Sequence, residues 1–189
     1  MSFRPTICVA ARGGIADMGY YRNWDVEDLF IESIALAVIY SDLKTVEAVR
    51  DRAFGRQEIK YVVEPETFDN TQETFEFFLE CSEFPITVDL EFGGIYSGYP
   101  VECVEEFDRI PDFDKLDGLS RGDDFYWDLM DNYKIPFKKL DLDHIRDLFL
   151  RDDGLKSRLS IDTKSVMERT FKERIGEHDD EAGVHKPRS

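Results

Sequence analysis

Carboxylates that alternate with apolar residues in the middle of the chain are the first candidates for a functional site. The stretch 86–92, "ITVDLEF", places Asp89 and Glu91 between apolar side chains, as a half-buried β-strand does. In the antiparallel register that joins the apolar faces of neighbouring strands, Asp89 lies opposite Glu76. On the following strand, a register with Phe92 opposite Val101 sets Glu91 opposite Glu102. Like charges that face each other directly are destabilising, so such an acidic face needs compensation.

Three kinds of compensation are open to this face: water and dissolved salt, a hard cation such as Mg²⁺ or Ca²⁺, or the basic side chains of a partner. No DxDxDG-type loop is present, which argues against a metal. The density of acids beside aromatic residues favours a basic protein partner, and a solvated surface is the simpler alternative. In the predicted helix "DDFYWDLMDNY", Trp127 does not lie on the face that packs inward, so it is expected to be exposed at the same interface. The predicted partner-binding residues are Glu76, Glu80, Asp89, Glu91, Glu102 and Trp127.

The negative charge of the chain is concentrated in one segment. The formal net charge is −17, and residues 61–120 (the acidic segment) contain sixteen Asp and Glu but only Arg109 and Lys115 as cations. Binding to nucleic acids or anionic membranes relies on protein cations, so neither is an expected partner. The predicted role is an intracellular interaction protein that binds a basic protein surface: an inhibitor, an immunity-type protein or a mimic of nucleic-acid charge.

An alternative site lies in the loop predicted after the first strand, "ARGGIADMGYYRNW". Glycines and a helix N-terminus offer backbone N–H groups that, with arginines, can bind an anionic small molecule. The absence of GxGxxG and GK[ST] motifs weakens this hypothesis, as does a helix-capping Asp25. A surface loop whose aromatic rings pack on the first helix is the competing interpretation. The anion-binding residues of the hypothesis are Arg12, Arg22, Tyr20, Tyr21 and Trp24.

One histidine has a spacing that suits acid–base chemistry. His144 has Asp141 and Asp147 three residues to either side on a predicted helix, which places all three on one face. An exposed polar face produces the same pattern. No GxSxG motif occurs, and the three cysteines lie in or beside strand-like runs, where they are expected to be buried. The sequence therefore predicts no catalytic residue, bound metal or cofactor, and favours a binding protein over an enzyme.

Local signals predict the N-terminal elements that would position these residues. The apolar run Thr6–Ala11 predicts a buried strand that two glycines end. Asp25 is placed to cap a helix whose second half is apolar nearly all round, which predicts a central core helix. A second helix is predicted over Leu43–Phe54 from its inward-facing apolar spacing.

An antiparallel meander is predicted within residues 57–105. Its third strand, 86–92, is expected to turn at glycines into a fourth strand near Tyr99–Val104, with Phe92 opposite Val101. The stretch Thr71–Glu80 fits a helix or a strand. The strand is favoured because Thr and Phe suit a pleated surface.

The remainder of the domain is predicted to be helical. One helix begins near Asp123, a second is capped by Asp141 and stopped by Gly154, and a third is capped by Asp162. The third helix is expected to end at about residue 174.

Together these elements predict a single α+β domain over residues 1–175, with helices packed on an antiparallel β-meander, followed by a flexible tail over 176–189. A chain with 42% hydrophobic residues and fifteen phenylalanines can bury a sizeable core. An odd number of cysteines and no membrane-length apolar run indicate a reduced, cytoplasmic protein. The sequence does not determine the oligomeric state.

Overall fold

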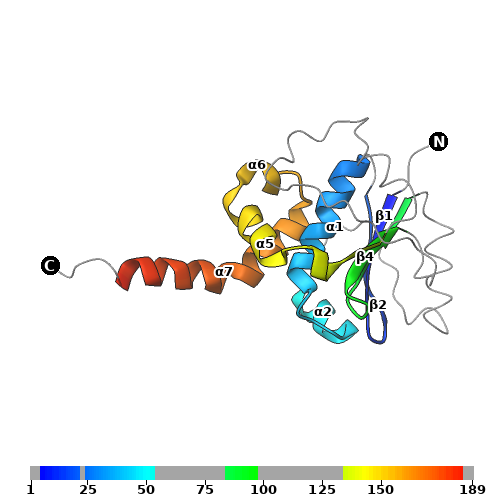
Figure 1. Ribbon diagram of the computed structural model, residues 1–189, viewed down its shortest axis with the longest axis horizontal. Helices are drawn as coiled ribbons and strands as arrows, with labels where there is room; N and C mark the ends of the chain where they lie inside the picture. The colour runs from blue at the N-terminus through cyan, green and yellow to red at the C-terminus, as the bar shows by residue number, and fades with distance from the viewer. Residues whose placement is uncertain (1–4, 22–23, 54–83, 98–133, 185–189) are drawn as a thin grey trace.

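The computed structural model describes residues 5–21, 24–53, 84–97 and 134–184, and these residues form a five-stranded sheet with helices packed on it (Figure 1). The strands are β1 (Pro5–Ala11), β2 (Gly14–Tyr20), β3 (Phe84–Asp89), β4 (Gly94–Ser97) and β5 (Lys134–Pro136). The helices are α1 (Val26–Tyr40), α2 (Val46–Arg52), the 3-10 helix η3 (Phe137–Lys139), α5 (Leu142–Arg151), α6 (Asp153–Lys156) and α7 (Ile161–Val184). The predicted α+β class with C-terminal helices is confirmed.

The sheet is mixed rather than antiparallel throughout. Its strand order is β2-β1-β3-β4-β5, in which β1 and β3 are parallel and the other neighbouring pairs are antiparallel. Parallel neighbours need a crossover connection, and α1 and α2 lie between β1 and β3 in the chain. Within the meander predicted over residues 57–105, β3 and β4 pair antiparallel, and residues 57–83 and 98–105 lie outside the described residues. The sheet as a whole is mixed because β1 joins β3 in parallel, a direction that the alternation of a strand does not record.

Helix α1 is the centre of the molecule. It contacts β1, β3 and β4 on one side and α5 and α7 on the other, so it lies between the sheet and the C-terminal helices (Figure 1). Asp25 caps it by accepting a hydrogen bond from the Asp28 N–H at 2.8 Å, as the sequence predicted. Apart from its first-turn residues Glu27 and Asp28, every residue of the helix is buried, which confirms the predicted core helix.

The residues after the first strand form a second strand where the sequence predicted a loop. Ala11 pairs with Gly14, so Arg12 and Gly13 make a two-residue turn between β1 and β2. Gly13 and Gly14 have φ angles of 105° and 131°, a region that side chains rarely allow and that glycine adopts freely. The strand was missed because β2 contains Gly and Asp, which are rare in strands.

The hairpin of β3 and β4 is tighter than predicted. Val88 pairs with Ile95 and Asp89 with Gly94, so the chain reverses over residues 90–93. Phe92 therefore lies in the turn rather than opposite a strand residue near position 101. Gly93, one of the glycines expected to turn the chain, adopts a φ of 84° and ends a reversal that begins three residues earlier, at Leu90.

The boundaries of the helices differ from the predictions in detail. Thr45 caps helix α2, which runs from Val46 to Arg52 and is therefore shorter than the helix predicted over 43–54. Asp141 caps α5 as predicted, but α5 ends at Arg151 and Gly154 lies within α6. A hydroxyl rather than a carboxylate side chain caps α7, because the Thr163 N–H donates to Ser160 Oγ at 3.1 Å.

Helix α7 continues to Val184, past the predicted end near residue 174, and its C-terminal half extends away from the sheet and the other helices (Figure 1). Its first half packs on α1, with Val166, Met167 and Phe171 buried. The division of the chain at residue 175 stays a prediction.

Candidate functional site

Asp89, predicted to face a partner, is a structural residue of the β3–β4 turn. Its Oδ1 accepts hydrogen bonds from the Glu91 N–H at 3.0 Å and the Phe92 N–H at 2.9 Å. Its Oδ2 accepts a hydrogen bond from the Tyr96 hydroxyl at 2.5 Å. Burial and this bond to Asp89 raise the pKa of Tyr96. Because both carboxylate oxygens are used within the hairpin, Asp89 is poorly placed to bind a partner.

The two residues at the tip of this turn face outward. Glu91 is exposed, and the side chain of Phe92 is 51% exposed with the Lys134 ammonium 4.3 Å from its ring centroid. The predicted pairing of Glu91 with a carboxylate on a following strand is wrong, because Glu91 lies in the turn. The other predicted partner-binding residues, Glu76, Glu80, Glu102 and Trp127, lie outside the described residues, as does the choice between strand and helix for 71–80.

The structure separates the residues of the proposed anion site. Arg12 is exposed at the turn between β1 and β2, whereas Tyr21 and Trp24 lie beyond the opposite end of β2, roughly 20 Å away at the usual rise of a strand. Tyr21 is buried, and its ring meets that of Trp24 edge-on with centroids 5.1 Å apart. This agrees with aromatic packing on the first helix. Tyr20 is the last residue of β2, and the structure describes its backbone only. Arg22 lies outside the described residues.

Among the described residues, His144 and Cys8 show no catalytic arrangement, and Cys81 and Cys103 lie outside these residues. His144 is exposed, and the carboxylates at its predicted spacing serve other groups: Asp141 caps α5 and Asp147 pairs with Arg146. Cys8 is buried as predicted, and burial raises the pKa of its thiol well above the usual value, with Asp17 and Asp89 adding to the shift. A buried thiol with a raised pKa is a poor nucleophile.

A buried carboxylate that the sequence analysis missed joins α1 to the first turn of α7. Glu32 is 0% exposed. It accepts hydrogen bonds from the Ser160 N–H at 3.1 Å, from the Ser160 hydroxyl at 2.8 Å and from the Thr163 hydroxyl. The Tyr21 hydroxyl donates to it at 3.5 Å. A lone Glu in the apolar run "IESIALAVIY" is the signal that could have found this network, since a buried charge must be paired or hydrogen-bonded.

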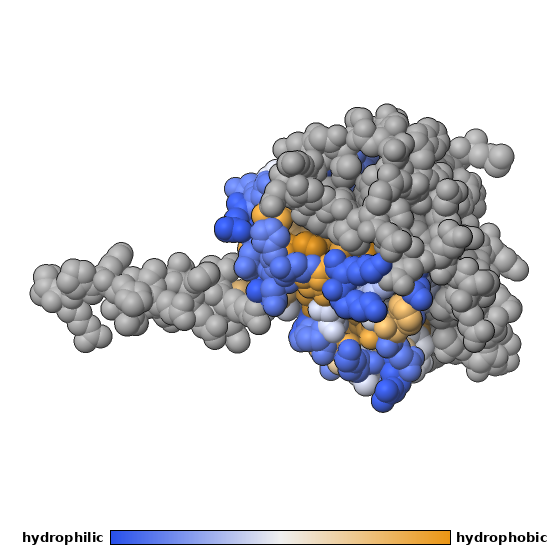
Figure 2. Space-filling view, viewed as in Figure 1, coloured by the Kyte–Doolittle hydropathy of each residue, from blue (hydrophilic) through white to orange (hydrophobic). Residues whose placement is uncertain are grey.

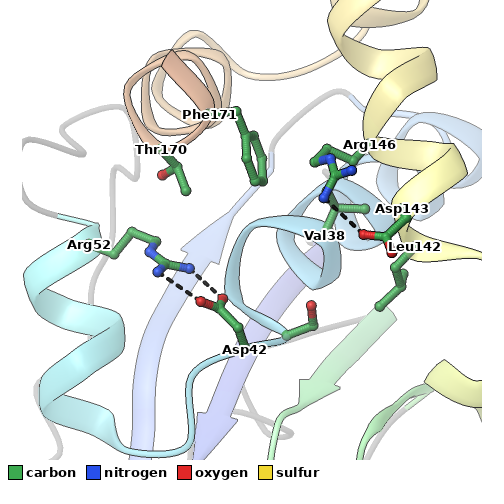
Figure 3. A pocket seen from close by; sticks show the side chains of 9 residues that line it. Val38, Asp42, Arg52, Leu142, Asp143, Arg146, Thr170 and Phe171 are labelled. Atoms are coloured by element: carbon green, nitrogen blue, oxygen red, sulfur yellow. Dashed lines mark hydrogen bonds and ion pairs between the residues drawn. The ribbon is translucent and has the colours of Figure 1, made fainter. Parts of the chain in front are cut away.

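A cavity of about 260 Å³ opens between the C-terminal end of α1, α2, α5 and α7 (Figure 3). Its lining combines apolar side chains with two arginine–aspartate pairs. The lining residues are Val38, Ser41, Asp42, Arg52, Leu142, Asp143, Arg146, Thr170 and Phe171. The lining residues come from separate helices between Val38 and Phe171, so no local sequence motif predicts the cavity.

The two arginines of the cavity are held in place by oxygen acceptors at its edge. Arg52 donates to both Asp42 carboxylate oxygens, at 2.6 and 3.0 Å, and to the Ile39 carbonyl at 2.6 Å. Arg146 donates to Asp143 at 2.9 Å and more loosely to Asp147 at 3.3 and 3.4 Å. Figure 3 shows the two arginines on opposite sides of the hollow, each directed at its aspartate.

Comparisons with known proteins assign no function to this cavity. No protein-family model, curated protein or solved structure matches the chain. Within the described ranges, no three His, Cys, Asp or Glu side chains are grouped so that they could hold a metal ion. None of the helices in the described part of the chain is long and apolar enough to cross a membrane.

Proposed function

We propose that this chain is a non-enzymatic interaction protein whose acidic segment binds a basic protein surface. The observation that carries the proposal is the segregation of charge: the acidic segment has sixteen acids and two cations, whereas the rest of the chain is nearly balanced. Solubility alone does not require such a concentration, because charges of both signs spread over a surface serve it equally well.

Many of the described acids outside the segment pair with cations or cap helices. Arg158 binds Glu27 at 2.5 Å and Asp28 at 2.8 Å. Similar pairs engage Asp42 and Asp143. In the described part of the acidic segment, by contrast, Glu91 projects into solvent beside an exposed aromatic ring, a combination that suits a basic partner surface.

The partner is a protein rich in Lys and Arg, and the role is that of an inhibitor, an immunity-type protein or a mimic of nucleic-acid charge. Such an acidic surface attracts a basic groove over long range, which accelerates association at low ionic strength. The carboxylates that carry the interaction are Glu76, Glu80, Glu91 and Glu102. Asp89 is excluded from this set because it stabilises its own hairpin.

The test is affinity purification of the tagged full chain from its native cell at about 50 mM and about 300 mM salt, which differ strongly in charge screening. The chain should retain a basic protein at low salt and lose it at high salt. A variant with Glu76, Glu80, Glu91 and Glu102 changed to Gln should bind that protein at least about tenfold more weakly.

A matched control has four exposed acids outside the acidic segment changed to their amides, with the same total charge change: Glu47→Gln, Asp51→Asn, Asp153→Asn and Glu168→Gln. This variant should retain the partner. The proposal fails if no basic protein is retained at low salt, or if both variants weaken binding equally, because net charge alone would then account for it.

A further inference from the structure

The cavity between α1, α2, α5 and α7 has the dimensions of a site for a small metabolite. Its volume of about 260 Å³ lies just below the ~300–1,000 Å³ usual for drug-sized ligands. A dinucleotide cofactor is therefore too large, whereas a molecule the size of an amino acid fits. This region is separate from the acidic segment, so the inference is independent of the proposed function.

The charges of the cavity are arranged with cations inside and anions at the mouth. The side chains of Arg52 and Arg146 are 24% and 13% exposed. Those of their partners Asp42 and Asp143 are 65% and 85% exposed. Exposed ion pairs contribute little free energy to stability. The two aspartates therefore lose little free energy when water or another cation replaces the arginine. The guanidinium groups can therefore accept a ligand anion without a large rearrangement.

Both arginines retain hydrogen-bonding capacity for such an anion. A guanidinium group has five N–H donors. Within the described residues, Arg52 makes three side-chain hydrogen bonds, and Arg146 also makes three. Each arginine therefore has donors left for a ligand carboxylate.

Apart from the charged residues, the cavity is lined by three apolar side chains and by the hydroxyl residues Ser41 and Thr170. Val38, Leu142 and Phe171 line it, and the Arg146 guanidinium lies over the Phe171 ring at 5.8 Å from the centroid (Figure 3). The space-filling view also shows hydrophobic surface bordered by hydrophilic residues over the helical part of the molecule (Figure 2). A ligand that fills the cavity therefore carries a hydrocarbon part.

We propose that the cavity binds a small zwitterion of the amino-acid type with an apolar side chain. An anion without a cation would be repelled by Asp42 and Asp143, and a cation alone would meet the guanidinium groups. A zwitterion satisfies both: its carboxylate binds Arg52 and Arg146, its ammonium group binds the aspartates at the mouth, and its side chain packs on the apolar wall.

The test is calorimetric titration and thermal unfolding of the full chain with each of the natural amino acids at millimolar concentration. At least one apolar amino acid should bind and raise the melting temperature, since a ligand of the folded state stabilises it. Its methyl ester, which lacks the anion, and its N-acetyl derivative, which lacks the cation, should each bind at least about tenfold more weakly. Inorganic phosphate is the probe for simple anion binding.

Variants separate the two halves of the site. Arg146→Met keeps an apolar stem on Phe171 but loses the donors, and should weaken amino-acid binding at least about tenfold. Arg151→Met, on the same helix but outside the cavity lining, should leave it unchanged. Asp143→Asn changes a highly exposed side chain and should reduce the preference for the amino acid over its N-acetyl derivative.

Three results would overturn the assignment. One is that no amino acid binds or raises the melting temperature. Another is that the ester or the N-acetyl derivative binds as tightly as the parent amino acid. The third is that phosphate binds as well as the amino acid and Asp143→Asn leaves the preference unchanged, which would show a simple anion site.

Discussion

Glu32 shows how one buried polar residue fixes the position of a helix. Glu32 and Ser33 interrupt the otherwise apolar buried surface of α1. The Glu32 carboxylate accepts hydrogen bonds from Ser160 and Thr163 at the start of α7. A carboxylate at a helix N-terminus satisfies N–H groups that have no partner within the helix and interacts favourably with the helix dipole. Glu32 therefore selects where the first turn of α7 docks on α1.

Replacing Glu32 by Leu should lower the free energy of unfolding by about 2–4 kcal/mol, because the Ser160 and Thr163 donors would be buried without an acceptor. Denaturant-induced unfolding measures the change. Ser33→Ala is the control, with an expected loss below about 1 kcal/mol, since the Ser33 hydroxyl bonds only the Phe30 carbonyl of its own helix. Adding Thr163→Val to the Glu32→Leu variant should restore part of the loss. Unchanged stability of Glu32→Leu would show that apolar packing alone positions α7.

At the scale of elements, Arg158 joins the connection between α6 and α7 to the first turn of α1. Burial raises the pKa values of Glu27 and Asp28, and the hydrogen bonds and charge of Arg158 oppose that rise. Burial alone would lower the pKa of Arg158, but its bonds to the two acids produce a net rise. The cation therefore limits the rise in the pKa values of the two partly buried acids.

Arg158→Met should make stability fall more steeply with rising pH. Without the cation, the folded-state pKa values of Glu27 and Asp28 rise further above their unfolded values. Stability from a raised pKa is present below the unfolded pKa and is lost as pH rises through the folded pKa. The variant should thus match the wild type closely below about pH 4 and be about 1–2 kcal/mol less stable at about pH 7.

Urea unfolding at a series of pH values measures this difference. Lys138→Met, which removes an exposed cation from η3, should give a curve parallel to that of the wild type. A constant difference between Arg158→Met and the wild type from about pH 4 to about pH 7 would contradict the prediction, since lost packing rather than altered ionisation would then explain it.

At the scale of the whole molecule, the net charge of −17 affects stability through repulsion within the folded chain. Raising NaCl from about 10 mM to about 500 mM should increase the unfolding midpoint gradually, because screening weakens that repulsion. MgCl₂ or CaCl₂ should raise the unfolding midpoint by the same amount as NaCl at equal ionic strength. A saturable rise at micromolar divalent cation would contradict this and indicate a specific metal site.

Much of the local structure follows from the sequence. The apolar run at Thr6–Ala11, the Asp25 cap and the all-round apolar half of α1 predicted elements that the structure contains. The Asp141 cap of α5 was also predicted correctly. These signals depend only on residues within one or two turns, so the sequence states them directly.

Tertiary structure alone decided the strand order and the roles of the side chains. The parallel pairing of β1 with β3 depends on how α1 and α2 cross over the sheet, which no strand's own pattern records. The use of Asp89 within its hairpin depends on a turn that begins earlier than the glycines suggested. The Glu32 network and the cavity each join residues more than one hundred positions apart in the chain. Periodicity determines which face of an element is buried, but the partner that covers that face is selected by packing the whole chain into one core.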